Sequence, residues 1–125
     1  MTHASLRYVI DENLRGPLRD AICHHNARGP ELIDAMRVGD GPDLPLGMLD
    51  ADLLLWAERE GRILVSRDKT TLPAHLNDHL QAGRRSPGIF VVRARGRLAE
   101  VVLFLLYAAF NGDPSEFEDR LVYIP

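Results

Sequence analysis

The stretch LDADLLLWAEREGRILVSRDKTTLPAH, residues 49–75, contains a helix, a strand and the start of a second helix. Residues 49–61 carry apolar side chains at helical spacing, and Gly61 stands where helices commonly end in a left-handed residue. The apolar run from Ile63 to Val65 is typical of a buried strand. A Thr near the cap and Pro73 in the first turn predict the next helix over residues 71–83. Helix, strand and helix in immediate succession indicate an α/β unit.

The same alternation extends in both directions from this stretch. We expect strands at 62–66 and also at 6–10, 31–38, 88–93 and 120–124, and further helices at 15–27 and 97–110. The segment 39–47 is dense in Gly and Pro and is predicted to be a loop. Strands that alternate with helices imply right-handed crossovers and a largely parallel sheet covered on both faces. The order predicts an α/β fold with a sheet of four to five strands.

Composition restricts the class of protein. The chain has 125 residues, of which 46% are hydrophobic and 26% charged, which predicts one soluble domain over residues 1–125. Its formal net charge of −3 gives no global positive field for nucleic acid, although a local basic patch would suffice. The single cysteine, Cys23, excludes an internal disulfide and a cysteine-based zinc site, and we expect it to be buried.

Hydropathy predicts a location away from membranes. The longest apolar run, residues 101–110, has about half the length needed to span a bilayer. The first thirteen residues contain no long apolar segment of the kind found in signal peptides. We therefore expect a cytoplasmic protein without membrane contact.

Three aspartates fall where a parallel sheet would bring them together. Asp11 follows the strand at 6–10, Asp68 follows the strand at 62–66, and Asp50 stands near the start of a helix that begins at the same edge. Ligands of open α/β sheets bind outside the carboxyl ends of the strands. Clustered carboxylates repel unless a cation or proton intervenes, and hard oxygen ligands favour Mg²⁺ or Mn²⁺. The pattern favours metal-assisted phosphodiester hydrolysis.

Each acid also has a purely structural interpretation. Asp50 could be the N-cap of its helix, and Asp68 could pair with Arg67 or Lys69. The segment 11–13 could be an ordinary strand-to-helix turn. Taken singly, these interpretations are at least as good as the functional ones. The coincidence of three acids on one predicted edge is what favours a site.

Two further patterns leave their interpretation open. His75 and His79 have the four-residue spacing of zinc ligands on a helix, but no accompanying HExxH glutamate is present, so we favour packed or surface histidines. Arginines gather around the fourth predicted strand, and they fit a phosphate-contacting rim and an ordinary solvated loop equally well. Together with the residues that flank Asp68, they give the expected RNA-binding set of Arg67, Lys69, Arg84 and Arg85.

Four blocks of sequence resemble a known family. They are YVIDENL (8–14), LDADLLLWAEREGRILVSRDKTTLPAH (49–75), SPGIFVV (86–92) and SEFEDRLVYIP (115–125). In order and spacing they resemble the PIN-like family of small prokaryotic proteins known as DUF5615, which is related to the Mut7-C type. The resemblance implies a three-layer α/β/α PIN-like fold with a mainly parallel sheet. It also implies a Mg²⁺- or Mn²⁺-dependent ribonuclease, of the kind that often serves as the toxin of a toxin–antitoxin pair.

The resemblance also implies roles for individual residues. By position, the catalytic and metal-binding acids are Asp11, Asp50 and Asp68, and the supporting residues are Glu12, Asn13 and Asp52. The sequence leaves open whether Asp50 or Asp52 faces the metal.

The sequence departs from this family at one position, which supports a second hypothesis. The fourth acid that many PIN nucleases carry is missing from the stretch 69–71, which reads Lys-Thr-Thr. A catalytically degenerate module on the same fold, acting through protein or nucleic-acid binding, is therefore the alternative. Its apolar helix at 97–110 would offer a surface for a homodimer or an antitoxin protein.

Overall fold

The centre of the protein is a five-stranded parallel sheet. The computed structural model describes residues 4–14, 16–93 and 97–125. All four strand pairings are parallel, in the order β2-β1-β3-β4-β5. The strands are β1 (Tyr8–Ile10), β2 (Ala35–Arg37), β3 (Ile63–Ser66), β4 (Ile89–Val92) and β5 (Leu121–Ile124). The predicted parallel α/β sheet is confirmed, with β2 and β5 as its edge strands.

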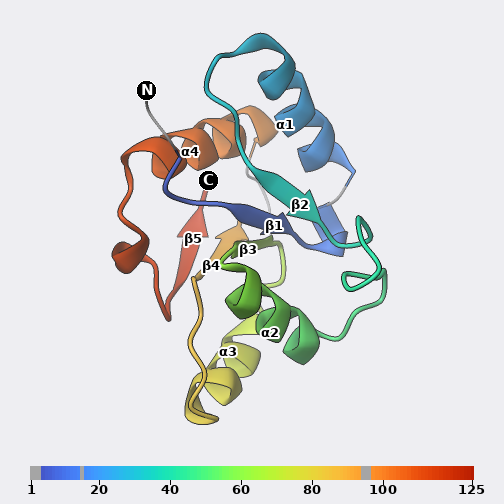
Figure 1. The fold of residues 1–125 in the computed structure, drawn as a ribbon, viewed down its shortest axis with the longest axis vertical. Helices are drawn as coiled ribbons and strands as arrows, with labels where there is room; N and C mark the ends of the chain where they lie inside the picture. The colour runs from blue at the N-terminus through green and yellow to red at the C-terminus, as the bar shows by residue number, and fades with distance from the viewer. Residues whose placement is uncertain (1–3, 15, 94–96) are drawn as a thin grey trace.

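Four α-helices cover both faces of this sheet (Figure 1). One face packs against α1 (Pro17–Arg28) and α4 (Leu98–Asn111), and the other packs against α2 (Asp50–Glu60) and α3 (Leu72–Gln81). Two short 3₁₀ turns, η1 (Glu12–Leu14) and η2 (Pro114–Glu116), complete the elements. The arrangement is the expected three-layer α/β/α architecture.

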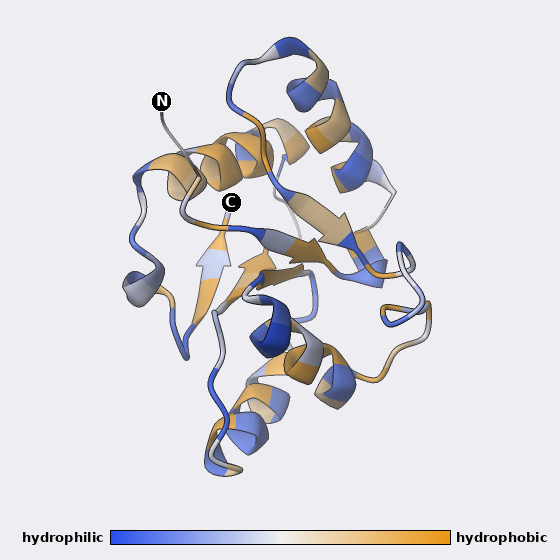
Figure 2. Ribbon diagram, viewed as in Figure 1, coloured by the Kyte–Doolittle hydropathy of each residue, from blue (hydrophilic) through white to orange (hydrophobic). Residues whose placement is uncertain are grey.

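Alternate residues of each strand enter two separate cores, because successive strand side chains point to opposite faces. In β1, Tyr8 and Ile10 pack with α1 and α4, whereas Val9 packs with α2 and α3. The central strands β3 and β4 are buried along their whole length. Burial on both faces explains why their sequences read as continuous apolar runs. Figure 2 shows these strands as hydrophobic and the outer helices as mixed.

Gly88 fixes the start of β4 beside the C-terminal segment. Its φ angle is +125°, and a Cβ there would stand 2.5 Å from the backbone oxygen of Phe117. Only glycine combines that backbone angle with so close an approach. The helix α2 ends as predicted, with Gly61 in the left-handed conformation at its C-cap.

Two expectations need correction. Cys23 is exposed, not buried, because α1 turns Leu18 and Ile22 to the core and the next residue lies about 100° further round the helix. The second strand is shorter than the predicted 31–38. Its preceding loop is held instead by Asn26, whose side chain bonds both the N–H and the C=O of Ile33.

The apolar helix α4 is only partly covered by its own chain. Val101 and Leu105 are buried, whereas Leu103 and Tyr107 are 64% and 69% exposed. Its hydrophobic surface therefore continues beyond the stripe that faces the sheet (Figure 2). Among the described residues, no helix combines the length and apolar character needed to cross a membrane.

Candidate functional site

The carboxyl edge of the sheet brings together residues from three distant parts of the chain. Strands β1 and β3 are neighbours, with Ile10 paired to Val65, so Asp11 and Ser66 follow side by side. The backbone N–H of Asp11 donates to the carbonyl of Val65 at 2.9 Å, which extends the ladder by one bond. Helix α2 begins at Asp50 on the same edge.

A buried serine organises this edge. Ser66 is fully buried, and its hydroxyl donates to Asp11 Oδ2 at 2.7 Å. The Ser66 hydroxyl oxygen also accepts from Asn13 Nδ2 at 3.2 Å and from the backbone N–H of Asp68 at 3.0 Å. A serine hydroxyl has one donor and two acceptor positions, so all three are used. Sequence reasoning missed Ser66 as a site residue, and its only signal was a polar residue at the end of an apolar strand.

The carboxylate of Asp11 is held in an unfavourable electrostatic position. Burial raises its pKa most, and the negative charges of Asp50 and Asp68 raise it further. Hydrogen bonds from Ser66 and from the backbone of Glu12 lower the pKa and offset part of this effect. Removal from water and nearby like charge both disfavour ionisation. A cation at this position would offset the cost of burial and the repulsion between the carboxylates.

Asp68 caps the loop that leads into α3. Its Oδ1 accepts from the backbone N–H groups of Thr70 and Thr71, at 3.0 and 2.9 Å, and from the Thr70 hydroxyl at 3.0 Å. Its Oδ2 accepts from the Thr71 hydroxyl. These bonds, led by the Thr71 hydroxyl, lower the pKa of Asp68 to about 2. Three of the four bonds crowd Oδ1, whereas Oδ2 accepts one bond and keeps a lone pair available.

The structure distinguishes Asp50 from Asp52. Asp50 is the first residue of α2, and Leu49 occupies the N-cap position. No side-chain hydrogen bond caps this end of the helix. The N-cap interpretation of Asp50 is therefore wrong. Its carboxylate lies 3.5 Å from Nε2 of His75, and its charge acts on Asp11. Asp52 is exposed and lines a different hollow, with Arg59 and Trp56. Of the two, Asp50 is the acid that faces Asp11.

Glu12 and Asn13, which follow Asp11, form hydrogen bonds with the neighbouring loops. Glu12 accepts from the backbone N–H of Gly47 at 2.6 Å and so ties η1 to the loop before α2. Asn13 accepts from the backbone N–H of Arg67 at 3.2 Å, in addition to its bond with Ser66. Arg67 and Lys69 are exposed, and neither forms an ion pair within the described ranges. The alternative pairing of Asp68 with these cations is thus absent.

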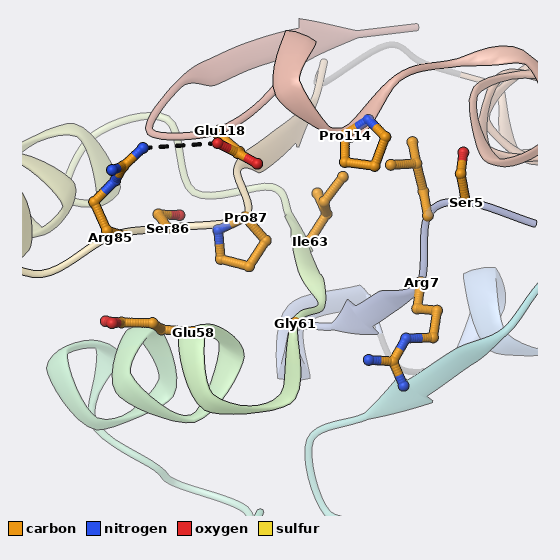
Figure 3. A pocket seen from close by; sticks show the side chains of 11 residues that line it. Ser5, Arg7, Glu58, Gly61, Ile63, Arg85, Ser86, Pro87, Pro114 and Glu118 are labelled. Atoms are coloured by element: carbon orange, nitrogen blue, oxygen red, sulfur yellow. Dashed lines mark ion pairs between the residues drawn. The ribbon is translucent and has the colours of Figure 1, made fainter.

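Arg84 and Arg85 lie at the opposite edge of the sheet, because they precede β4 instead of following a strand. Arg84 pairs with Glu58 at 3.1 Å, and Arg85 pairs with Asp119 at 2.8 Å. Arg85 and Glu58 line a cavity of about 400 Å³ at this amino edge, where Arg85 also meets Glu118 (Figure 3). The structure therefore does not bring these arginines to the three aspartates.

The histidine pair is divided in the same way. His75 meets Asp50 at the carboxyl edge. His79 is buried, and its Nε2 lies 3.0 Å from Glu58 and 2.8 Å from the carbonyl of Arg85. The two rings thus have different partners, in agreement with packed histidines and not with a shared zinc ion.

The carboxylate oxygens at the carboxyl edge fit a cation that is held by few protein ligands. Within residues 4–14, 16–93 and 97–125, no three His, Cys, Asp or Glu side chains come close enough to hold a metal ion. Asp11 accepts one hydrogen bond on each oxygen and so keeps lone pairs available, as does Asp50. Mg²⁺ commonly uses one or two carboxylates and completes its shell with water and substrate phosphate. Asp11 and Asp50 match that smaller set.

Comparison with known proteins identifies no relative. No family model, no curated protein and no solved structure matches this chain. The resemblance to the PIN-like family therefore stays a prediction.

Proposed function

We propose that the protein is a metal-dependent endoribonuclease whose site is the carboxyl edge of the sheet at Asp11. The observation that carries the proposal is the position of the Asp11 carboxylate, which is partly buried next to the charges of Asp50 and Asp68. Keeping the partly buried Asp11 carboxylate next to two further negative charges costs free energy that the fold itself does not require. Such an arrangement is typical of groups that bind a cation or exchange a proton.

In this proposal Asp11 and Asp50 hold Mg²⁺ or Mn²⁺, which lowers the pKa of a bound water and stabilises charge on a phosphate. Ser66 fixes the orientation of Asp11 through the 2.7 Å bond. Asp68 adds negative charge while it caps the loop before α3. Arg67 and Lys69, exposed beside Asp68, attract the phosphate of the substrate.

The proposal is tested by incubating purified protein with single-stranded RNA and Mn²⁺ and following the appearance of shortened products. We expect cleavage by the wild-type protein and by Asp52→Asn, and none by Asp11→Asn or Asp50→Asn. Asp52→Asn is the matched control, since it removes the same charge from the same helical turn but away from Asp11. Equal cleavage by the wild type and Asp11→Asn would mean that another nuclease is responsible.

A second candidate function has its own observation. Both carboxylate oxygens of Asp68 are engaged by Thr70 and Thr71, and α4 exposes Leu103 and Tyr107. A catalytically inactive module would use the α4 surface to bind a second copy or an antitoxin protein. In that case the protein would sediment as a dimer or complex, Leu103→Ser would dissociate it, and RNA would remain uncut.

A further inference from the structure

A groove that includes Ile10, the residue before Asp11, combines two arginines with an apolar floor. It lies between α1 and the edge strand β2 and has a volume of about 330 Å³. Ile10, Ile22 and Met36 contribute apolar surface, and the charged residues are Arg19, Arg37 and Asp40. This volume is at the lower end of the range for small-ligand pockets, about 300–1,000 Å³. It suits a group the size of a nucleotide.

The groove reaches the edge of the sheet that carries Asp11. Arg37 is the last residue of β2 and is paired in register with Ile10, which directly precedes Asp11. Arg19 lies in the first turn of α1, which starts from this edge after η1. Two guanidinium groups therefore stand near the end of the strand that delivers the central carboxylate.

The charges of this groove are less well balanced than those of the amino-edge cavity. Arg37 uses its Nε on Asp40 at 2.7 Å, and among the described residues its two terminal nitrogens have no hydrogen-bonding partner. Arg19 meets only its neighbour Asp20, at 3.3 Å, and both side chains are well exposed. In contrast, the lining of the amino-edge cavity contains two arginines, Arg7 and Arg85, and two glutamates, Glu58 and Glu118, of which Arg85 and Glu118 pair with each other (Figure 3).

We infer that this α1–β2 groove binds the phosphate backbone of single-stranded RNA and guides the strand to the aspartates. The inference rests on the proposed nuclease function and names the path of its substrate. Arg19 and Arg37 each bind a phosphate through the nitrogens that face away from Asp20 and Asp40. Contacts of this kind fix the register of the strand without reading its sequence.

The first test measures binding without cleavage. A labelled single-stranded RNA is titrated in EDTA by fluorescence anisotropy at several salt concentrations, with Arg19→Ala, Arg37→Gln, the double variant, and Arg84→Ala as a charge-matched control at the opposite edge. Affinity for single strands falls with about the 0.7 power of salt concentration per phosphate contact. Each groove variant should therefore weaken binding about fivefold at 0.1 M salt, and the double variant should lower the salt slope by about 1.4.

The second test uses the single cysteine of the chain. Cys23 is exposed and lines the groove, so bound RNA should slow its alkylation by N-ethylmaleimide. The control is Ala82→Cys in a Cys23→Ala background, which places the only thiol at an exposed position after α3. RNA should protect Cys23 and leave Cys reactivity at position 82 unchanged.

The outcomes separate this inference from the proposed function. If the groove variants bind RNA as tightly as the wild type, or if RNA leaves Cys23 unprotected, the groove inference is wrong even where Asp11→Asn abolishes cleavage. If the groove effects appear but no preparation cleaves RNA with Mn²⁺, the groove inference stands and the nuclease proposal fails. Absence of any RNA binding by the wild-type protein would overturn the groove inference outright.

Discussion

The hydroxyl of Ser66 should stabilise the fold mainly by supporting the ionised form of Asp11. Ser66→Ala removes three hydrogen bonds at once, at 2.7, 3.0 and 3.2 Å. The bond to the Asp11 carboxylate is charge-assisted, and such bonds contribute about 1.5–3 kcal/mol, whereas a neutral bond contributes about 1 kcal/mol. Asn13 is exposed, so its amide group can turn to water. We therefore expect a loss of about 2–3 kcal/mol in the free energy of unfolding at pH 7.

The effect should depend on pH with a definite sign. The Ser66 hydroxyl lowers the pKa of Asp11, against burial, which raises it. Without the hydroxyl the folded-state pKa of Asp11 rises further above its unfolded value. The folded state of the variant then binds more protons than the unfolded state, so its stability falls as pH rises through this window. The loss relative to wild type should shrink to about 1 kcal/mol at pH 3, where Asp11 is protonated and only neutral bonds remain.

Urea unfolding at pH 3 and pH 7 measures both quantities. The matched control is Ser86→Ala, because Ser86 is also buried but its hydroxyl accepts only one bond, from the backbone N–H of Gly88 at 3.0 Å. It should cost about 1 kcal/mol at both pH values. In an Asp11→Asn background the pH dependence of Ser66→Ala should disappear. A loss for Ser66→Ala that equals the control and does not change with pH would refute the reasoning.

Two further predictions concern the neighbouring acids. Asp68 has its pKa lowered to about 2, so it contributes stability above pH 4 that is lost as pH falls through about 2. Because the side chain is largely solvated, Asp68→Ala should cost only about 1 kcal/mol at pH 7 and clearly less at pH 2, where the carboxyl is about half protonated, in urea unfolding with the exposed Asp78→Ala as control. Asp50→Asn should lower the pKa of Asp11 in a carboxyl NMR titration, because the Asp50 charge raises it, whereas Asp52→Asn should leave that pKa unchanged.

Much of the fold could be predicted because burial on both faces leaves a clear pattern. The strands β3 and β4 are short apolar runs, and the helix α2 before them ends at Gly61. The shared edge of Asp11, Asp50 and Asp68 follows from the parallel sheet alone. The placement of Arg84 and Arg85 could have been corrected by the same rule, since residues that precede a parallel strand lie at its amino edge.

The rest of the site depended on contacts that sequence spacing does not contain. A serine at the end of a strand is common, and only the pairing of β1 with β3 shows that Ser66 meets Asp11. Asp68 holds the loop before α3 through the hydroxyls of Thr70 and Thr71, and in the sequence these two residues read only as the place where a fourth acid is missing. Arg19 and Arg37 are eighteen positions apart and share a groove only because α1 packs beside β2.

The central claim is that Asp11 and Asp50 bind a divalent cation, and titration of Mn²⁺ followed by electron paramagnetic resonance tests it directly. At neutral pH the wild-type protein and Asp52→Asn should each bind one Mn²⁺ ion that Mg²⁺ displaces. Asp11→Asn and Asp50→Asn should lose this binding while remaining folded. Failure of the wild type to bind Mn²⁺, or equal binding by all four proteins, would contradict the account.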